Sequence, residues 1–385
     1  MSTFTLIIPV FQTPQILRLF LDSLKQTLSQ NSDIIFVNDG SGYTVQRMLQ
    51  SFQQELCHHR FQIHVEVLEH QVSQGSVVSI NEALRHVNDH CKYVTFLDSD
   101  TILQAHWQEQ LISSFTEDDI GAIGGVLLYP QSGGIQCCGI TYCGNSGKHL
   151  YLNSDPVILN DAALFEVQAT VFAFCCIRWE VIKRVGLLDE CFFNGYEDLD
   201  YQFRLRKLGY RILINPSIRH YHWEKSNGNH REYNRKSNLG RFWQKHGTYV
   251  KDDLACFIRN RFENLLPLSE SYNAVDCCEG RDAAVKVKTW LMEYENIHIS
   301  SWTDASYACH NCDTIWIPEL FDSGKIRDSQ PFLFLCDQMV QMLDNQYWWS
   351  IRKQINQHDL VLDLYGNVLF FSQLQQGFWP GRKIR

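Results

Sequence analysis

The sequence has 385 residues, enough for two compact domains. Its composition, with 45% hydrophobic and 20% charged residues, is typical of a globular protein. Its formal net charge is −9, from 34 basic and 43 acidic residues. A nucleic-acid-binding protein normally carries a basic footprint, so nucleic acid is not expected as a partner.

Strand and helix patterns alternate over the first hundred residues. Short apolar runs rich in β-branched residues predict strands at 5–10, 33–37, 63–68 and 93–97. Apolar residues at helical spacing predict helices from Pro14 to about Leu24, from the turn at 38–42 to about Cys57, and over 75–87. This repeat implies an α/β fold with a mainly parallel sheet and right-handed crossovers.

The rest of the chain has a mixed pattern. Residues 121–151 are glycine-rich and strand-like, which suggests a mixed extension of the sheet. Further helices are predicted at 179–185, 197–208, 282–294 and 336–354, strands at 211–214 and 332–335, and a hairpin around Gly366-Asn367. A polar, basic segment spans 220–251. We therefore expect a first domain over 1–250 and a smaller α/β domain of unknown role over 251–385.

Three polar or turn-forming segments each follow a predicted strand of the first domain. They are Pro9-Val10-Phe11, Asn38-Asp39-Gly40 and Asp98-Ser99-Asp100. Ligands of parallel α/β sheets bind at the carboxyl ends of the strands. The three segments are therefore expected to line one cleft.

Asp98-Ser99-Asp100 places two carboxylates beside one small residue just past a buried strand. Hard oxygen ligands in this arrangement can hold a divalent cation. The alternative is a solvated turn in which Asp100 or Thr101 caps the next helix. The motif alone does not decide between them.

A second acidic cluster, Glu197-Asp198-Leu199-Asp200, begins a predicted helix. The helix dipole favours negative charge there, which accounts for the composition. It does not account for the aromatic pair Phe192-Phe193 and the Gly195-Tyr196 pair just upstream, which could line a cleft. A carboxylate in that setting can act as general base towards a hydroxyl group.

Two histidines, His220 and His222, are separated by one residue after a predicted strand. In an extended segment both side chains point to the same face. Imidazole suits Mn²⁺ and similar ions, so either histidine can complete a metal site with two aspartates. A histidine taken alone would more often be a surface or core residue.

These motifs together resemble the inverting family 2 glycosyltransferases of GT-A fold, especially bacterial polysaccharide and rhamnosyl-type transferases. The matching segments occur in the family's order over about residues 4–245. They are LIIPVF, DIIFVNDGSG, GSVVSIN, FLDSD, GAIGGVLLYPQSGGIQCCGITY, VGLLDECFF and GYEDLDYQFRLRKLGYRILINP with HYHW. The resemblance implies a Rossmann-like domain that binds a nucleotide-diphosphate sugar.

The resemblance also implies roles for single residues. Pro9 and Phe11 would border the nucleotide base and Asp39 would hydrogen-bond it, with Gly75 and Ser99 also on the donor side. Asp98 and Asp100 would form the metal–diphosphate site together with His222, which matches the family's histidine better than His220. Asp198 would be the catalytic base, with Glu197 beside it. Two positions depart from the family: Asn38 replaces an aspartate, and Ile80 replaces an arginine that could contact a phosphate.

The implied reaction is inverting transfer of a sugar from a UDP- or dTDP-sugar to a hydroxyl of a glycan or other acceptor, with Mn²⁺ or Mg²⁺ on the diphosphate. A basic set could close over the diphosphate or an anionic acceptor, although a solvated basic helix accounts better for most of it. The set is Lys225, Arg231, Arg235, Lys236, Arg241 and Lys245. A catalytically silent subunit that binds nucleotide sugar or glycan is the alternative.

Other classes of protein fit less well. A dinucleotide-dependent oxidoreductase needs a glycine fingerprint after its first strand, and a P-loop enzyme needs a Walker element. Neither is present. Paired carboxylates also serve glycoside hydrolysis, but that class does not explain the turns after the strands. Cys309-His310-Asn311-Cys312 has zinc-like spacing without a second spaced pair, and Tyr347-Trp348-Trp349 is expected to be core or interface.

The sequence also bears on location. Residues 1–9 lack the pattern of a secretory signal, and no apolar run of about 18 residues is present. The 14 cysteines include adjacent pairs such as Cys137-Cys138, a poor geometry for disulfides, so free thiols in a reducing cytosol are expected. We predict a cytoplasmic protein, with peripheral attachment to the inner membrane face and homo-oligomerisation left open.

Overall fold

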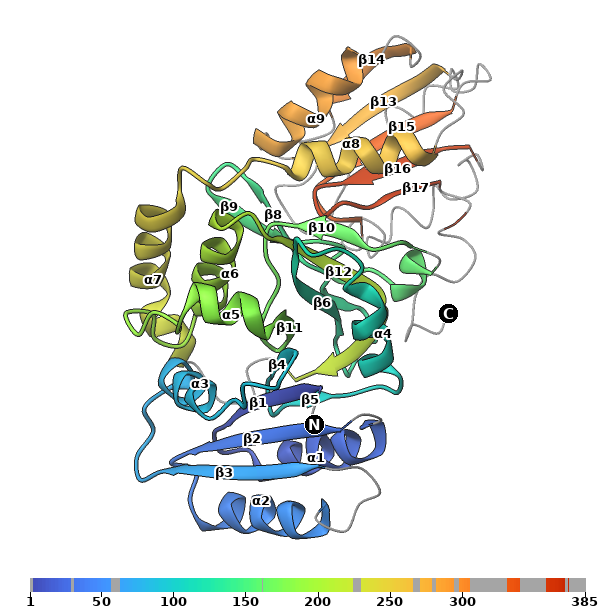
Figure 1. The fold of residues 1–385 in the computed structure, drawn as a ribbon. Coiled ribbons are helices and arrows are strands. Elements are labelled where there is room, and N and C mark those ends of the chain that lie inside the picture. Colours follow the sequence, from blue (N-terminus) through green and yellow to red (C-terminus); the bar gives the residue numbers. More distant parts are fainter. Residues whose placement is uncertain are drawn as a thin grey trace. The chain divides into compact units, whose positions relative to one another are not determined.

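The computed structural model describes residues 3–28, 31–56, 63–160, 162–223, 230–265, 271–278, 282–293, 298–304, 331–339, 358–370 and 373. The chain divides into two compact units. Unit 1 consists of Met1–Ile140 and Ile158–Val250, and unit 2 of Thr141–Val157 and Lys251–Arg385. Figure 1 shows their elements in sequence colours.

Unit 1 begins with the alternation that the sequence predicts. Its first elements are β1 (Phe4–Val10), α1 (Pro14–Thr27), β2 (Ser32–Asp39), α2 (Tyr43–Leu56), β3 (His64–His70), α3 (Ser76–Arg85) and β4 (Tyr93–Leu97). The remaining elements are β5 (Thr101–Ile102), α4 (Trp107–Ser114), β6 (Ile120–Leu128), β7 (Ile135–Cys137), β10 (Phe165–Val167), β11 (Phe174–Arg178), α5 (Trp179–Val185), α6 (Glu197–Lys207), β12 (Arg211–His222) and α7 (His230–His246), with the short helix η1 (Pro156–Leu159) at the border of the units.

The described strands of unit 1 form one mixed sheet. Its order is β10-β12-β6-β11-β4-β1-β2-β3, with β5 paired to β12 and β7 paired to β6. Strands β4, β1, β2 and β3 are parallel neighbours, whereas β11 runs antiparallel to both β4 and β6. The predicted α/β class with a mixed, mainly parallel sheet is therefore confirmed.

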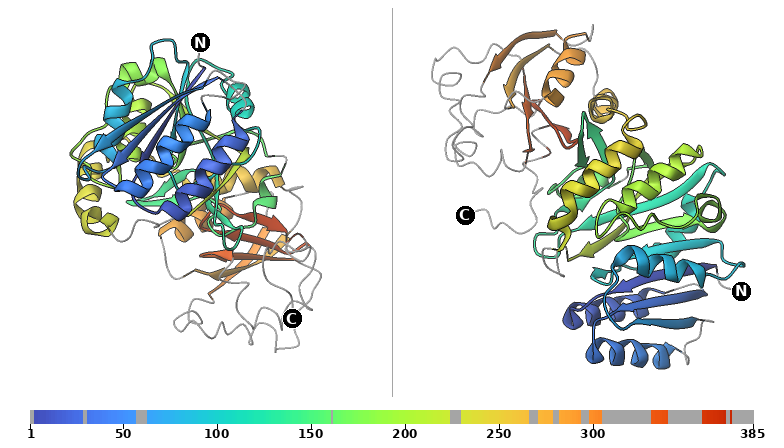
Figure 2. Two further views of the ribbon diagram at one scale, coloured as in Figure 1. Left: turned by 90° about the horizontal axis from the view of Figure 1, so that it is seen from below. Right: turned by 90° about the vertical axis from the view of Figure 1, so that its left-hand side faces the viewer.

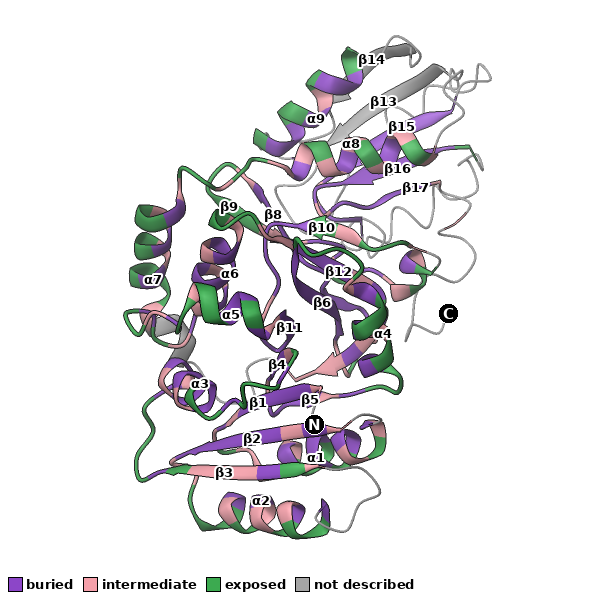
Figure 3. Ribbon diagram, viewed as in Figure 1, coloured by how far each residue is buried: buried purple, intermediate pink, exposed green. Residues whose placement is uncertain are grey.

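The main core lies between this sheet and the helices α1, α2 and α4. Alternate side chains of β1 are fully buried in it, because successive residues of a strand point to opposite faces. These are Phe4, Leu6, Ile8 and Val10. They meet the apolar stripes of α1 and α2, which lie side by side across the β1–β3 part of the sheet (Figure 2). Figure 3 shows the same pattern as buried strands beneath helices with one exposed face.

Strand β12 differs most from its prediction. The sequence predicts a strand at 211–214, whereas β12 continues to His222. Pro216 lacks a ladder donor, and its surroundings are accommodated by a register shift between Ile214 and Arg219 in the pairing with β6. The strand resumes beyond this irregularity. Its continuation carries both histidines towards the carboxyl edge of β4.

Unit 2 contains a second sheet. The elements of unit 2 are β8 (Ile140–Cys143), β9 (Ser146–His149), α8 (Leu254–Leu265), β13 (Ser271–Cys277), α9 (Asp282–Met292), β14 (His298–Asp304), β15 (Phe332–Cys336), β16 (Leu360–Asp363) and β17 (Val368–Phe370). Strands β8 and β9 pair with each other. The order β14-β13-β15-β16-β17 is parallel except for the last pair, which forms the predicted hairpin at Gly366. Beyond residue 339, the predicted helix 336–354 lies outside the described residues.

Residues 141–157 group with unit 2, although the sequence places them in a first domain over 1–250. Backbone hydrogen bonds explain the grouping: the N–H of Tyr151 donates to the carbonyl of Tyr365 at 2.7 Å, and that of Asp253 to Tyr142 at 3.1 Å. The side chains of Leu150 and Tyr151 are buried. The division into units is therefore not a single cut at residue 250.

No helix in the described ranges is both long and apolar enough to span a bilayer.

Candidate active site

The turn Asp98-Ser99-Asp100 is held between two strands. It follows β4 and leads directly into β5, whose two residues pair antiparallel with the end of β12. In this pairing Thr101 lies opposite His222, and the N–H of Trp223 donates to the carbonyl of Asp100 at 3.0 Å. The backbone therefore delivers His222 to the two aspartates.

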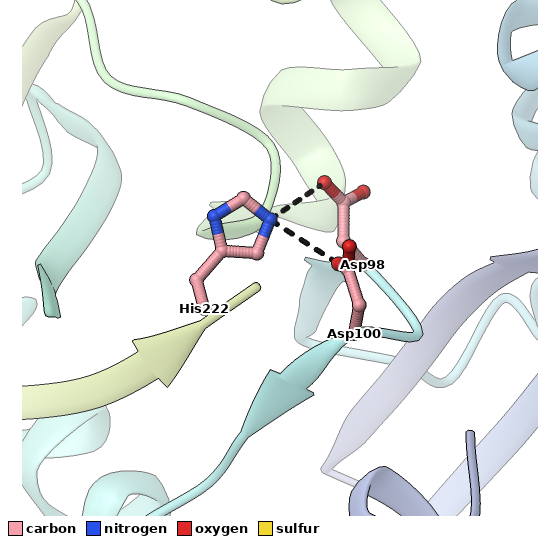
Figure 4. Close-up of side chains that lie close together, drawn as sticks. All are labelled: Asp98, Asp100 and His222. Atoms are coloured by element: carbon pink, nitrogen blue, oxygen red, sulfur yellow. Dashed lines mark ion pairs between the residues drawn. The ribbon is translucent and has the colours of Figure 1, made fainter. Parts of the chain in front are cut away.

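Asp98, Asp100 and His222 form a cluster (Figure 4). The His222 Nε2 lies 3.2 Å from Oδ1 of Asp100 and 3.6 Å from Oδ2 of Asp98. Asp100 and His222 are largely buried, whereas the Asp98 side chain is half exposed. Three ligand atoms within 4.8 Å of one another, with one open side, suit a divalent cation that also binds a substrate oxygen.

Gln136 orients the imidazole of His222. Its Oε1 accepts from Nδ1 of the ring at 2.6 Å, and its Nε2 donates to the His222 carbonyl at 3.3 Å. A proton held on Nδ1 leaves Nε2 as the ligand atom that faces the carboxylates. No sequence motif indicates this role, because the pairing of β7 with β6 is what brings Gln136 close.

The charges of the cluster also fit a cation. Burial lowers the pKa of His222, but hydrogen bonds and negative charge from Asp100 and Asp98 outweigh it and raise the pKa to about 10. Without a metal ion, the imidazolium is thus the counter-ion of the two carboxylates. A divalent cation would replace that proton, as metal ions do at histidine ligands.

His220 does not take part, although the sequence left either histidine as a ligand. Its ring packs edge-on against Phe174 with centroids 4.3 Å apart, and its Nδ1 accepts from the N–H of Gln104 at 3.1 Å. Burial lowers its pKa to about 3, so the ring is neutral. It is a core residue.

Helix α6 presents the second acidic cluster. Asp198 is buried at the first turn, and its Oδ1 accepts from the N–H of Leu199 at 2.8 Å. Two hydrogen bonds between Gln202 and the backbone of Thr170 hold the helix to the loop before β11. The Ala173 carbonyl on that same loop accepts from Asp98 N–H at 3.3 Å. One loop therefore links the catalytic-base candidate to the metal turn.

The charge of Asp198 is felt at β7, the strand that carries the partner of His222. Burial is the main cause that raises the pKa of the Cys137 thiol to about 12, and the negative charge of Asp198 contributes to it. Cys137 directly follows Gln136, the partner of His222. The role of Asp198 as the base stays a prediction.

Glu197 links α6 to the start of α3. One of its oxygens accepts from the N–H of Gly195, and the other from the hydroxyl of Ser76 at 3.2 Å. The Ser76 hydroxyl and N–H also donate to the side chain of Asn194. Gly75, which precedes α3, is thereby placed next to the loop that leads into α6.

Asp39 is surrounded by protein donors. Its oxygens accept from the N–H groups of Gln74 and Gly75 and from the Ser73 hydroxyl, at 2.7, 2.9 and 2.6 Å. His70 Nδ1 lies 2.6 Å from Asp39. Burial raises the pKa of Asp39, but these hydrogen bonds outweigh it and the net pKa is lowered. In the structure Asp39 organises the loop 70–75, and its predicted contact with a nucleotide base stays a prediction.

The end of β1 lies beside the turn that follows β2. The Ser41 hydroxyl donates to the carbonyl of Val10 at 3.1 Å and accepts from the N–H of Gln12 at 2.9 Å. Pro9 and Phe11 flank this contact and are partly exposed, while Ser99 is buried in the metal turn. The adjacent strands β4, β1 and β2 thus bring the three predicted segments to one sheet edge.

Two predicted cations have other partners. Arg241 donates to the carbonyl of Cys191 at 2.6 Å, and Lys245 pairs with Asp189 and Asp200 at 2.7 and 2.6 Å. These contacts bind α7 to the rest of unit 1. Lys225, the Arg231 side chain, the 309–312 cysteines and the aromatic run 347–349 lie outside the described residues.

Comparison with known proteins finds related sequences. The model for Glycosyl transferase family 2 matches residues 5–136. The pre-mycofactocin glycosyltransferase of Mycobacterium tuberculosis is 26% identical over 212 residues, which cover 55% of this chain and 41% of that protein. The chain thus spans less than half the length of that relative.

Solved structures also resemble this chain. GalNAc-T7 with UDP, GalNAc and Mn²⁺ aligns with a TM-score of 0.50 at 13% identity, over 69% of this chain and 52% of that chain. The mannosyltransferase PcManGT of Pyrobaculum calidifontis, in complex with GDP-Man and Mn²⁺, aligns with a TM-score of 0.47 at 15% identity, over 65% of each chain. The sheet of unit 1 and the sequence match define a glycosyltransferase domain of the GT-A fold. The sequence match supports a family 2 glycosyltransferase domain within this chain.

Proposed function

We propose that the protein is an inverting glycosyltransferase that moves a sugar from a nucleotide-diphosphate sugar, a UDP- or dTDP-sugar, to a hydroxyl of a glycan or other acceptor. The observation that carries the proposal is the meeting of Asp98, Asp100 and His222 in one cluster, whose turn shares the loop before β11 with the helix that bears Asp198. A silent binding subunit has no need of the buried carboxylate of Asp198 on that helix.

Each group has a distinct task. Asp98, Asp100 and His222 would hold Mn²⁺ or Mg²⁺, which when bound supplies positive charge to the departing diphosphate. Asp198 accepts the proton of the acceptor hydroxyl while that oxygen bonds to the anomeric carbon. The bond from this carbon to the diphosphate oxygen breaks on the opposite face, so the configuration inverts. Glu197 keeps the first turn of α6 and the start of α3 together.

The donor side is proposed to lie along the strand ends. Pro9 and Phe11 would border the nucleotide base, and Ser99 and Gly75 would adjoin the diphosphate and the sugar. Asp39 contributes through loop 70–75, whose backbone it fixes. UDP with Mn²⁺, present in the GalNAc-T7 structure, is the first probe to try.

The test is a panel of nucleotide sugars with MnCl₂, in which sugar transfer and donor hydrolysis are both measured. The wild-type chain is expected to turn over at least one donor, and Asp198→Asn is expected to lose about 100-fold or more of kcat while nucleotide–Mn²⁺ affinity is kept. The matched control is Glu180→Gln, an exposed carboxylate of α5, which should behave as wild type.

Two results would contradict the proposal. Nucleotide binding without turnover of any donor would support the silent subunit instead. Full activity in Asp198→Asn would remove Asp198 as the base.

A further inference from the structure

One face of helix α7 (His230–His246) contacts α6, the helix that carries Asp198, and the segment directly before it. The contacting residues share helical spacing of three and four positions. They are Asn238, Arg241, Phe242, Lys245 and His246. Their partners lie on α6 and on the segment 189–196 directly before it, which we call the entry loop.

The entry loop has an unusual backbone. Asn194, Gly195 and Tyr196 have positive φ angles of 50°, 143° and 69°. Two of these three residues have side chains, for which this region is unfavourable, so surrounding contacts must hold the conformation. The next two residues are Glu197 and Asp198. The direction in which α6 starts, and with it the position of Asp198, therefore depends on what holds the loop.

Asn238 supplies that restraint. Its side chain is almost fully buried, and its amide nitrogen donates to the carbonyls of Phe193 and Gly195 at 3.0 and 2.8 Å. One amide group thus binds the carbonyls on either side of Asn194, the first residue of the positive-φ segment. Arg241, one turn further along α7, donates to the carbonyl of Cys191 at 2.6 Å. Three carbonyls of the entry loop are therefore bound by α7 side chains.

The remaining contacts fix α7 to α6 itself. The Phe242 ring packs against Tyr196 and Phe203, with centroids 5.9 and 5.2 Å apart. Asp200, which is fully buried, accepts from His246 at 2.8 Å and pairs with Lys245 at 2.6 Å. In Figure 1 the two helices stand side by side.

We propose that α7 is a positioning element of the active site and that Asn238 is its principal positioning residue, holding the entry loop so that Asp198 meets the acceptor hydroxyl. The inference rests on the proposed function. The inference adds a structural support to that function, because β12 ends with the metal ligand His222 and is followed along the chain by α7. One stretch of sequence then bears on both the metal site and the base.

A role in stability alone predicts a different result. If α7 only stabilised unit 1, its variants would lower the folded fraction and the melting temperature together, and every folded molecule would keep full kcat. If α7 positions the base, folded molecules that bind nucleotide normally would be slow. A displacement near 1 Å at a reacting group can cost about 100-fold in rate.

The experiment uses the full chain with Asn238→Leu, which keeps the side-chain size and removes both donors, and Ser237→Ala on the exposed face of α7 as matched control. Calorimetric titration with UDP and MnCl₂, or with the diphosphate of whichever donor is accepted, gives the fraction of competent sites and the affinity. We expect Asn238→Leu to keep both values and the donor KM, and to lose about 10- to 100-fold in kcat per competent site. Ser237→Ala should match wild type in every measurement.

A second variant protects the test against misfolding. Arg241→Met removes one loop contact from an exposed side chain, and a smaller loss of kcat with unchanged nucleotide affinity is expected. Wild-type kcat per competent site in Asn238→Leu, or in Arg241→Met should Asn238→Leu fail to fold, would overturn the inference. Lack of turnover by the wild-type chain would instead overturn the proposed function, and the inference with it.

Discussion

Gln136 is the residue on which the direction of the His222 ring depends. Its amide oxygen accepts a hydrogen bond from Nδ1–H of His222, and its amide nitrogen donates to the His222 carbonyl. Such partners of metal-ligating histidines fix the tautomer and raise the affinity for the ion. A residue without a charge or a motif can therefore matter as much as a ligand.

We predict that Gln136→Leu weakens Mn²⁺ binding by about 10- to 100-fold, because Nδ1–H loses its acceptor and the ring can turn away from the aspartates. Titration of Mn²⁺ by electron paramagnetic resonance measures this directly. Gln54→Leu, at an exposed position of α2, is the control. Equal affinity in the two variants would show that Gln136 does not orient the ligand.

His70 lies between two carboxylates. Its Nδ1 is 2.6 Å from Asp39, and its Nε2 is 2.5 Å from Glu82 on α3. Burial lowers the pKa of His70, but the two carboxylates outweigh it, so the net pKa is raised above 6.5. The protonated ring ties β2, β3 and α3 together next to Gly75.

This arrangement predicts a pH-dependent stability. Because the folded pKa of His70 is raised, its contribution is fully present below the unfolded value of 6.5 and is lost as pH rises through the folded pKa. The difference in unfolding free energy between wild type and His70→Gln should therefore be largest near pH 6 and shrink towards pH 9. Urea unfolding across this range measures it. A difference that grows with pH would contradict the assignment.

At the scale of elements, α3 begins under a tight restraint. Gly75 has φ +92° and ψ 164°, a region open almost only to glycine. A Cβ there would lie 2.8 Å from the ring of Phe193 on the entry loop. Gly186, after α5, has a similar backbone, φ 83° and ψ −161°, with nothing within 4 Å of a built Cβ.

Comparison of the two glycines separates backbone strain from contact. We predict that Gly186→Ala loses about 1–3 kcal/mol of unfolding free energy. Gly75→Ala should lose more and also lower turnover, since Phe193 must shift with the entry loop. Chemical denaturation and steady-state kinetics on both variants test this. Equal losses with unchanged kcat in Gly75→Ala would show that the Phe193 contact is unimportant.

The elements of unit 1 were largely predictable, and the exceptions have physical reasons. Buried parallel strands and amphipathic helices give strong local patterns, as in β1 and α1. Strand β12 was underestimated because Pro216 suggests an end, whereas a register shift lets the ladder resume. The polar sequence of α7 predicts only a basic segment. The contacts of Asn238 and Lys245 that dock this helix depend on tertiary structure.

Part of the candidate site could be predicted from sequence. Asp98, Asp100, Asp198 and His222 stand in motifs, and the structure brings Asp98, Asp100 and His222 into one cluster. His70, Gln136 and Asn238 stand in none, because their roles depend on strand register and helix docking. His70 lies opposite Asp39 in the β2–β3 ladder, so a correct strand register would have identified it.

At the scale of the whole molecule, the two units are interleaved in sequence. The segment 141–157 belongs to unit 2, yet it interrupts unit 1. Within unit 2, Leu150 approaches Gly366, and the Tyr151 ring packs against Phe257 with centroids 5.9 Å apart. Removal of residues 251–385 would leave these apolar side chains without partners.

We predict that a chain ending at Val250 aggregates or binds hydrophobic dyes, because Leu150 and Tyr151 become exposed. Leu150→Ser with Tyr151→Ser in the same truncated chain should reduce dye binding. Size-exclusion chromatography and dye fluorescence check both. A monodisperse, dye-silent chain 1–250 would show that the segment finds cover within unit 1.

The pairing of β5 with the end of β12 has a consequence for biosynthesis. Asp98 and Asp100 leave the ribosome long before His222, whose strand β12 pairs with β10, β6 and β5. Contacts so distant in sequence carry a loop-closure cost and slow folding. A cation that binds all three ligands stabilises only the finished sheet. Tight metal binding would then be confined to molecules whose sheet is complete. A nascent chain that has only the two carboxylates would lack the third ligand.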